Sequence, residues 1–223
     1  MPASSSLDAR IRATAGDTPL PFLYRLLRSP ARRLLERYFD LTIDGAHHLP
    51  ARGPYIVAAN HHNYLDGVVL AAAVTPQISF LVMPRVWRAT PLHPVFHRQI
   101  GSIPLEVGRP DLGALRRALA TLDAGRVVGI FPEGPFSVRG RLEPGLHGVG
   151  VLALRSGAPV VPAAIRGTYE ALTGRRFYVP RRHPISVRFG APRTFAPERG
   201  DARRSARAAV TDGIMADIAQ LLR

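Results

Sequence analysis

The sequence predicts an α/β fold with a mostly parallel central sheet flanked by helices and an N-terminal amphipathic helix pair. Short apolar runs of strand length alternate along the chain with stretches in which apolar residues recur at helical spacing. The apolar fraction of 46% in 223 residues predicts one folded domain with a sizeable core. In such folds, functional groups gather in the loops that follow the carboxyl ends of the strands.

The predicted strands and helices alternate from residue 41 to the end of the chain. Apolar runs place strands at 41–44, 55–59, 78–83, 103–107, 127–131, 160–165 and 185–189. Helical periodicity places helices at 66–74, 93–100, 112–124, 147–155 and 202–222. The regular alternation indicates a single unit over residues 41–223.

The first 40 residues precede this unit. Residues 1–19 are polar and Ser-rich, without the apolar stretch of a signal peptide, and predict a flexible tail. Residues 20–40 carry leucines at helical spacing with arginines between them, and Pro30 is expected to split them into a helical hairpin. Two interpretations of this hairpin are open: packing on the domain, or anchoring in a membrane interface.

The chain carries a formal net charge of +14, and all 30 basic residues are arginine. The absence of cysteine excludes disulfides, thiolate metal ligands and cysteine nucleophiles. A strongly basic chain favours anionic partners, and the lack of any zinc-finger, RNP or basic-zipper pattern argues against nucleic acid. No apolar run approaches the ~20 residues needed to cross a bilayer. We therefore expect a peripheral protein on the anionic, cytoplasmic face of the cell membrane.

A histidine precedes an aspartate by five residues at the point where an apolar strand gives way to a helix, in the run Asn-His-His-Asn-Tyr-Leu-Asp of residues 60–66. Histidine is suited to moving a proton near neutral pH, and a carboxylate can hold its other ring nitrogen in the required tautomer. His61 and Asp66 are therefore predicted to form a catalytic proton-transfer pair. A surface histidine is the plain alternative, and a metal site of His61, His62 and Asp66 fits by ligand type, although no metal is expected.

Three further blocks follow in order. They are Gly-Ser-Ile-Pro-Leu-Glu-Val-Gly-Arg at 101–109, Phe-Pro-Glu-Gly at 131–134, and Val-Val-Pro-Ala-Ala-Ile at 160–165. Together with residues 60–66, their order and spacing resemble the glycerolipid acyltransferase family of the PlsC type over residues 41–190. The resemblance implies an acyltransferase domain at 41–223 that moves a fatty acyl group from acyl-CoA or acyl carrier protein to a lysolipid hydroxyl. The acceptor that this resemblance favours most is 1-acylglycerol 3-phosphate. No cofactor is expected beyond the acyl thioester, which is a co-substrate.

The resemblance also implies residue roles. His61 would take the proton of the acceptor hydroxyl, Asp66 would orient the imidazole, and Arg109 would hold the acceptor phosphate. The other substrate-binding residues that it implies are Asn60, Phe131, Pro132, Glu133, Gly134 and Pro162. Backbone amides of residues 131–134 are candidate donors to the tetrahedral oxyanion. Plain alternatives are a salt-bridged strand end for Arg109, a helix cap or arginine pair for Glu133, and turn structure for Pro162.

The third block departs from the family pattern. The family continues with Thr, Arg, Ser, whereas this chain has Pro135, Phe136 and Ser137. The resemblance places the lost arginine near the acceptor phosphate, and Arg139 and Arg141 are close enough in sequence to replace it. Otherwise the acceptor is a non-phosphate lipid, such as a lyso-ornithine lipid or a glycolipid. Two more alternatives are a serine-type hydrolase, disfavoured by the missing Gly-x-Ser-x-Gly turn, and an inactive membrane-binding homologue.

Overall fold

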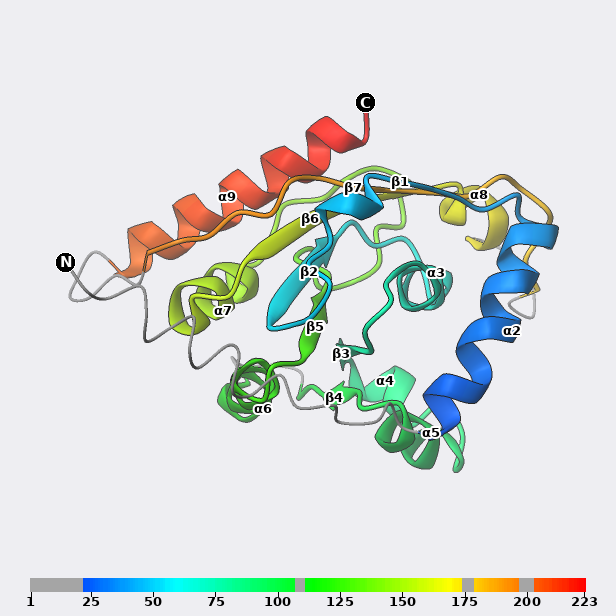
Figure 1. Cartoon of the computed structure of the whole chain (residues 1–223), viewed down its shortest axis with the longest axis horizontal. Helices are drawn as coiled ribbons and strands as arrows, with labels where there is room; N and C mark the ends of the chain where they lie inside the picture. The colour runs from blue at the N-terminus through cyan, green and yellow to red at the C-terminus, as the bar shows by residue number, and fades with distance from the viewer. Residues whose placement is uncertain (1–21, 107–110, 174–178, 197–202) are drawn as a thin grey trace.

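A seven-stranded sheet with helices on both faces organises the computed structural model, which describes residues 22–106, 111–173, 179–196 and 203–223 (Figure 1). The predicted α/β class is confirmed. In chain order the strands are β1 (Thr42–Asp44), β2 (Tyr55–Ala59), β3 (Ile78–Val82), β4 (Ile103–Pro104), β5 (Val127–Ile130), β6 (Val160–Arg166) and β7 (Ser186–Phe189). The helical elements are α2 (Phe22–Tyr38), the 3₁₀ turn η1 (Ala46–His48), α3 (Leu65–Ala73), α4 (Pro84–Trp87), α5 (His93–Gln99), α6 (Leu112–Asp123), α7 (Gly148–Ser156), α8 (Thr168–Leu172) and α9 (Arg203–Leu221).

The strand order is β1-β7-β6-β2-β5-β3-β4. The strands from β6 to β4 run parallel, and β7 pairs antiparallel with β6. Every expected strand is present within one residue of its predicted bounds, except the fourth, which was expected to run to residue 107. It ends at Pro104 because its neighbour β3 ends at Val82, the residue that pairs with Pro104. The short helices α4 and α8 were not expected, since a single turn carries too few periodic positions to be recognised.

The two faces of the sheet build two apolar clusters. In β2, Tyr55 and Val57 join the cluster beneath α3, whereas Ile56 and Ala58 join the one beneath α6, α7 and α9. Successive side chains of a strand point to opposite faces, so a strand covered on both faces must be apolar throughout, as β2 is. Both clusters therefore fix β2, which carries the predicted catalytic loop at its carboxyl end.

The predicted N-terminal hairpin is wrong, because Phe22–Tyr38 is one helix that contains Pro30. A proline inside a helix removes one hydrogen bond, and it bends the helix when the freed carbonyl has another partner. Pro30 is exposed, so the carbonyl without its donor lies on the side that water can reach. The opposite side packs on α3, where the hydroxyl of Tyr24 donates to the carbonyl of Ala71 at 3.3 Å. The expected tail, residues 1–19, lies outside the described residues.

None of the described helices combines the length and the hydropathy that a membrane span requires.

Candidate active site

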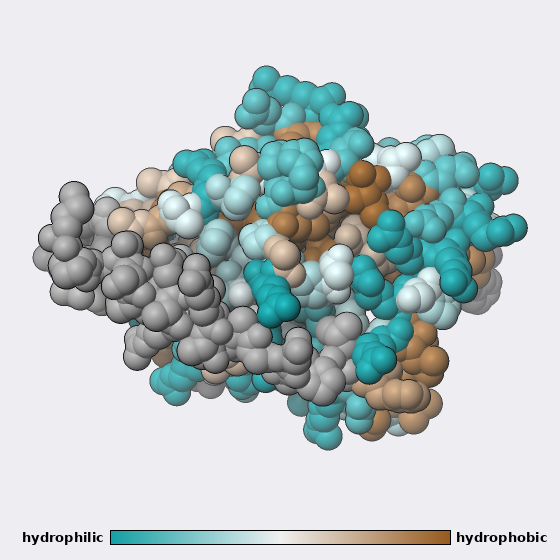
Figure 2. All heavy atoms as spheres, viewed as in Figure 1, coloured by the Kyte–Doolittle hydropathy of each residue, from teal (hydrophilic) through white to brown (hydrophobic). Residues whose placement is uncertain are grey.

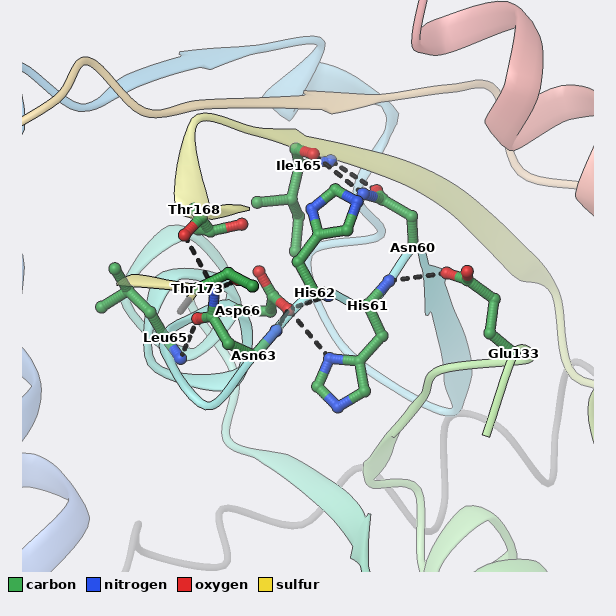
Figure 3. Close-up of polar contacts among 10 residues, drawn as sticks. All are labelled: Asn60, His61, His62, Asn63, Leu65, Asp66, Glu133, Ile165, Thr168 and Thr173. Atoms are coloured by element: carbon green, nitrogen blue, oxygen red, sulfur yellow. Dashed lines mark hydrogen bonds and ion pairs between the residues drawn. The ribbon is translucent and has the colours of Figure 1, made fainter. Parts of the chain in front are cut away.

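His61 and Asp66 form a buried pair on the loop between β2 and α3 (Figure 3). The ring Nδ1 of His61 lies 2.9 Å from Oδ2 of Asp66, and Asp66 is completely buried. A carboxylate can only accept, so Nδ1 carries the proton of this hydrogen bond. The neutral imidazole therefore presents an unprotonated Nε2, which is the atom a general base needs. The geometry confirms that the predicted pair meets.

Asp66 also shapes the loop that holds the histidine. The same Oδ2 accepts from the backbone amides of His62 at 2.6 Å and Asn63 at 2.8 Å. This one carboxylate oxygen therefore serves two backbone amides as well as the imidazole. Because all three donors meet on one oxygen, the orientation of the ring and the path of the backbone depend on a single side chain.

Two asparagines of the same loop tie it to β6 and α8. The amide of Asn60 donates to the carbonyl of Ile165 at 2.9 Å and accepts from its amide at 2.7 Å. Asn60 is fully buried, so the expectation that it contacts substrate is corrected: both its polar atoms serve the backbone of β6. Asn63, which sequence reasoning missed, donates to the carbonyl of Thr168 at 2.8 Å. These contacts join segments about a hundred residues apart, a pairing with no local sequence signal.

Glu133 holds two loops together. Its Oε1 accepts from the amide of His61 at 2.7 Å, and its Oε2 accepts from the amide of Glu143 at 2.7 Å. Among the described residues it neither caps a helix nor pairs with an arginine, the two plain alternatives. Burial raises the pKa of Glu133 to about 7, although the two amide donors act in the opposite direction. We assign it the positioning of the His61 backbone rather than contact with substrate.

Substituting glutamine for Glu133 is expected to lower the free energy of unfolding, because the new NH₂ group faces one of the two amide donors. An unmatched buried donor costs about 1–3 kcal/mol.

The raised pKa of Glu133 also makes this stability difference depend on pH, with a defined sign. Between pH 4.5 and about 7 the unfolded carboxyl loses its proton before the folded one, so this group's contribution to stability falls as pH rises through that window. The wild-type advantage over Glu133→Gln should therefore shrink from pH 5 to pH 8 in urea unfolding. An exposed-site control, Glu36→Gln, should show no such trend, and a pH-independent advantage would contradict the assignment.

Two phenylalanines enclose the imidazole. The Phe131 ring stacks on His61 with centroids 3.7 Å apart and an interplanar angle of 6°, and Phe136 contacts it edge-on at 4.5 Å. A backbone hydrogen bond also joins the loop of Phe136 to the loop of His61, because the amide of Ser137 donates to the carbonyl of His61 at 2.8 Å. Phe136, the residue that departs from the family pattern, thus lies against the histidine that is predicted to be catalytic.

A cavity of about 970 Å³ opens beside His61. Its walls are mostly apolar and come from helices α2 to α7 and the ends of β3 and β5. The predicted residues Phe131, Pro132 and Gly134 line it, together with Phe136. Gly134 has φ of +78°, and a Cβ there would lie 2.7 Å from Leu146 Cδ1, so this corner requires glycine.

Other predicted residues lie elsewhere. The expectation that Pro162 lines the acyl pocket is wrong: it lies inside β6, outside the cavity wall, and its Cγ faces Gly190. Arg139 and Arg141 are exposed and also lie outside the wall, with Arg141 Nε 3.7 Å from Glu143 Oε1. Arg109 falls outside the described residues.

Two of the four residues at 131–134 that were expected to offer backbone N–H groups to the oxyanion have none available. Pro132 has no N–H group, and the amide of Gly134 donates to the carbonyl of Phe131 at 3.0 Å. Neither residue can therefore donate a backbone hydrogen bond to the oxyanion unless the loop rearranges.

Two alternatives lose their geometric basis. The rings of His61 and His62 point to opposite sides of the loop, and no group of three or more His, Asp or Glu among the described residues could hold a metal ion (Figure 3). The hydroxyl of Ser137, a serine bonded to the His61 backbone, donates to the carbonyl of Arg141 at 2.6 Å rather than to the imidazole. No serine–histidine pair is formed at His61 in the part of the chain that the structure describes.

The fold and the site define a class: an α/β protein with a buried histidine–aspartate pair beside a large apolar cavity. Residues 40–166, more than half of the chain, match the family model described as Acyltransferase. The protein belongs to this family and is an acyltransferase, as the four sequence blocks predict.

Known proteins support this assignment. The chain is 23% identical over 146 residues to a 1-acyl-sn-glycerol-3-phosphate acyltransferase of Bacillus subtilis, covering 65% of this chain and 72% of that protein. It is 28% identical over 139 residues to the chloroplastic enzyme BAT2 of Brassica napus, but spans only 38% of that protein. The crystal structure of PlsC from Thermotoga maritima shares the fold, with a TM-score of 0.70 at 19% identity over 97% of this chain and 88% of the other. The resemblance to glycerolipid acyltransferases is confirmed.

Proposed function

We propose that this protein transfers a fatty acyl group from acyl-CoA or acyl carrier protein to the free hydroxyl of 1-acylglycerol 3-phosphate, giving phosphatidic acid. Nε2 of His61 takes the hydroxyl proton while the oxygen attacks the thioester carbonyl. The carbon–oxygen bond forms, the carbon–sulfur bond breaks, and His61 returns the proton to the leaving thiol. Asp66 stabilises the imidazolium that exists between these steps.

The observation that carries this proposal is the His61–Asp66 pair at the wall of the 970 Å³ apolar cavity. A buried apolar wall suits acyl chains, because each methylene removed from water contributes about 0.8 kcal/mol. The acceptor is supported by the Bacillus and Brassica relatives, both of which are 1-acyl-sn-glycerol-3-phosphate acyltransferases.

Phe136 favours a second candidate, an O-acyltransferase for a non-phosphate lysolipid. An apolar ring against His61 offers no charge to a phosphate. An acceptor panel separates the two: lysophosphatidic acid, a lyso-ornithine lipid and a monoacylated glycolipid, each supplied with acyl-CoA or acyl carrier protein. Product should form fastest with lysophosphatidic acid. Faster transfer to either uncharged or zwitterionic acceptor would replace the first proposal with the second.

We also propose that the protein acts at the surface of an anionic membrane, through the outer face of α2. Phe22, Leu26, Leu34 and Tyr38 recur at multiples of four residues and are 40–79% exposed. The neighbouring positions Arg25, Arg33 and Arg37 are exposed as well, so an apolar stripe runs beside a basic one. Figure 2 shows apolar surface gathered where the start of α2 lies beside α5, whose exposed apolar residues include Val95.

Polar substitution of this stripe is expected to weaken vesicle binding. Phe22→Ser with Leu26→Gln removes two side chains that would enter the acyl boundary, and a full burial of each contributes about 1.5–3 kcal/mol. At least a tenfold loss of cosedimentation with phosphatidylglycerol vesicles should result. Val138→Ser is the matched control, since Val138 is also an exposed apolar residue, 75% exposed, but lies on the loop between β5 and α7 rather than on α2. Equal binding by both variants would show that α2 does not contact the bilayer.

A further inference from the structure

An arginine outside the four sequence blocks contacts the Phe136 ring. The guanidinium carbon of Arg85, on α4, lies 5.8 Å from the Phe136 ring centroid. That ring contacts His61, so one aromatic ring separates the cation from the catalytic imidazole. The neighbouring residues Met83 and Val86 line the cavity, and Arg85 lies at its edge, outside the wall itself. The contact places a positive charge against the Phe136 ring, which also contacts His61, from a segment distant in sequence.

Arg85 is also available for a ligand. It is exposed, and no carboxylate of the described residues lies within ion-pair distance of it. A contact with the face of a ring occupies no hydrogen-bond acceptor, so the N–H donors of the guanidinium remain for a phosphate, which they can bind in a bidentate manner.

The arginines that line the cavity are differently placed. Arg28 donates to the carbonyls of Ala71 and Ala72, which fixes α2 on α3. Arg204 and Arg207 reach the cavity from the start of α9, which packs on α7 on the side of the molecule away from α3 (Figure 1). Neither has a recorded contact with the aromatic rings around His61.

We infer that Arg85, held over Phe136 beside His61, binds the phosphate of the acceptor in place of the arginine that Phe136 replaces. The inference rests on the proposed function and names a specificity-determining residue for it.

Binding can be measured apart from turnover by placing each variant in a His61→Ala background. We would titrate a short-chain lysophosphatidic acid and the matching monoacylglycerol into Arg85→Ala, Arg85→Lys and Arg88→Ala, by calorimetry. Arg88 is the matched control, an exposed arginine three residues further along. Arg85→Ala should weaken lysophosphatidic acid binding at least tenfold and leave monoacylglycerol binding unchanged, with Arg85→Lys between.

In the catalytically intact protein, Arg85→Ala should raise KM for lysophosphatidic acid at least tenfold with kcat within about twofold, since the lost contact is made before and during the reaction alike. Unchanged lysophosphatidic acid affinity in Arg85→Ala, or an equal loss in Arg88→Ala, would overturn the inference. Failure of the wild type to acylate lysophosphatidic acid would overturn the proposed function instead, and the binding experiment would still decide whether Arg85 holds a phosphate.

Discussion

Replacing His61 with alanine is expected to lower kcat for acyl transfer by about 10² to 10⁴-fold, the usual contribution of a positioned general base. The hydroxyl of a lipid is a poor nucleophile at neutral pH, and the hydrogen bond from Nδ1 to Asp66 leaves Nε2 of His61 free to take its proton. The fold should survive, because the backbone contacts of residue 61 with Glu133 and Ser137 do not depend on its side chain.

The measurement is release of free thiol from acyl-CoA in the presence of lysophosphatidic acid, with product confirmed by mass spectrometry. His62→Ala is the matched control, since its ring lies on the opposite side of the same loop and contacts Tyr169 instead (Figure 3). That variant should keep activity within about tenfold of wild type. A His61→Ala enzyme with a tenth or more of wild-type kcat would remove His61 from the chemistry.

The second large effect is expected at Asp66. Two substitutions there should distinguish the contribution of its negative charge from that of the hydrogen bonds that it accepts. Asparagine can place its carbonyl oxygen where Oδ2 accepts three hydrogen bonds, so the loop should keep its path. Its NH₂ group would occupy the site of Oδ1, which has no hydrogen-bond partner among the described atoms. The negative charge that stabilises the imidazolium is lost, and kcat should fall by about 10²-fold or more.

Alanine removes the acceptor altogether. Two buried amides and one ring nitrogen lose their partner at about 1–3 kcal/mol each, so Asp66→Ala should lower the free energy of unfolding by roughly 3 kcal/mol or more. Asp66→Asn should lower it by about 1–2 kcal/mol. Urea unfolding and steady-state kinetics on both variants test this separation. If both lost stability equally, the shared-oxygen geometry would not be what holds the loop.

Much of the fold could be predicted from the chain because its signals are local. Fully apolar runs such as Val127–Ile130 mark strands covered on both faces, and the helical periodicity of Leu112–Asp123 marks a helix. Pro30 misled the same reasoning, since a proline ends a helix only where the freed carbonyl has no other partner. That condition depends on which side of the helix faces solvent, a property of the packed structure.

The sequence by itself predicted that His61 and Asp66 would meet, because the two residues lie only five positions apart on one strand-to-helix loop. It also determined the α/β class, because short apolar runs of strand length alternate along the chain with segments of helical periodicity. Only the tertiary structure decided that Asn60 and Glu133 hold the loop rather than the substrate, and that Arg85 stands behind Phe136. Those relations join strands and loops far apart along the chain, and such contacts arise only when the sheet brings the carboxyl ends of its strands to one edge.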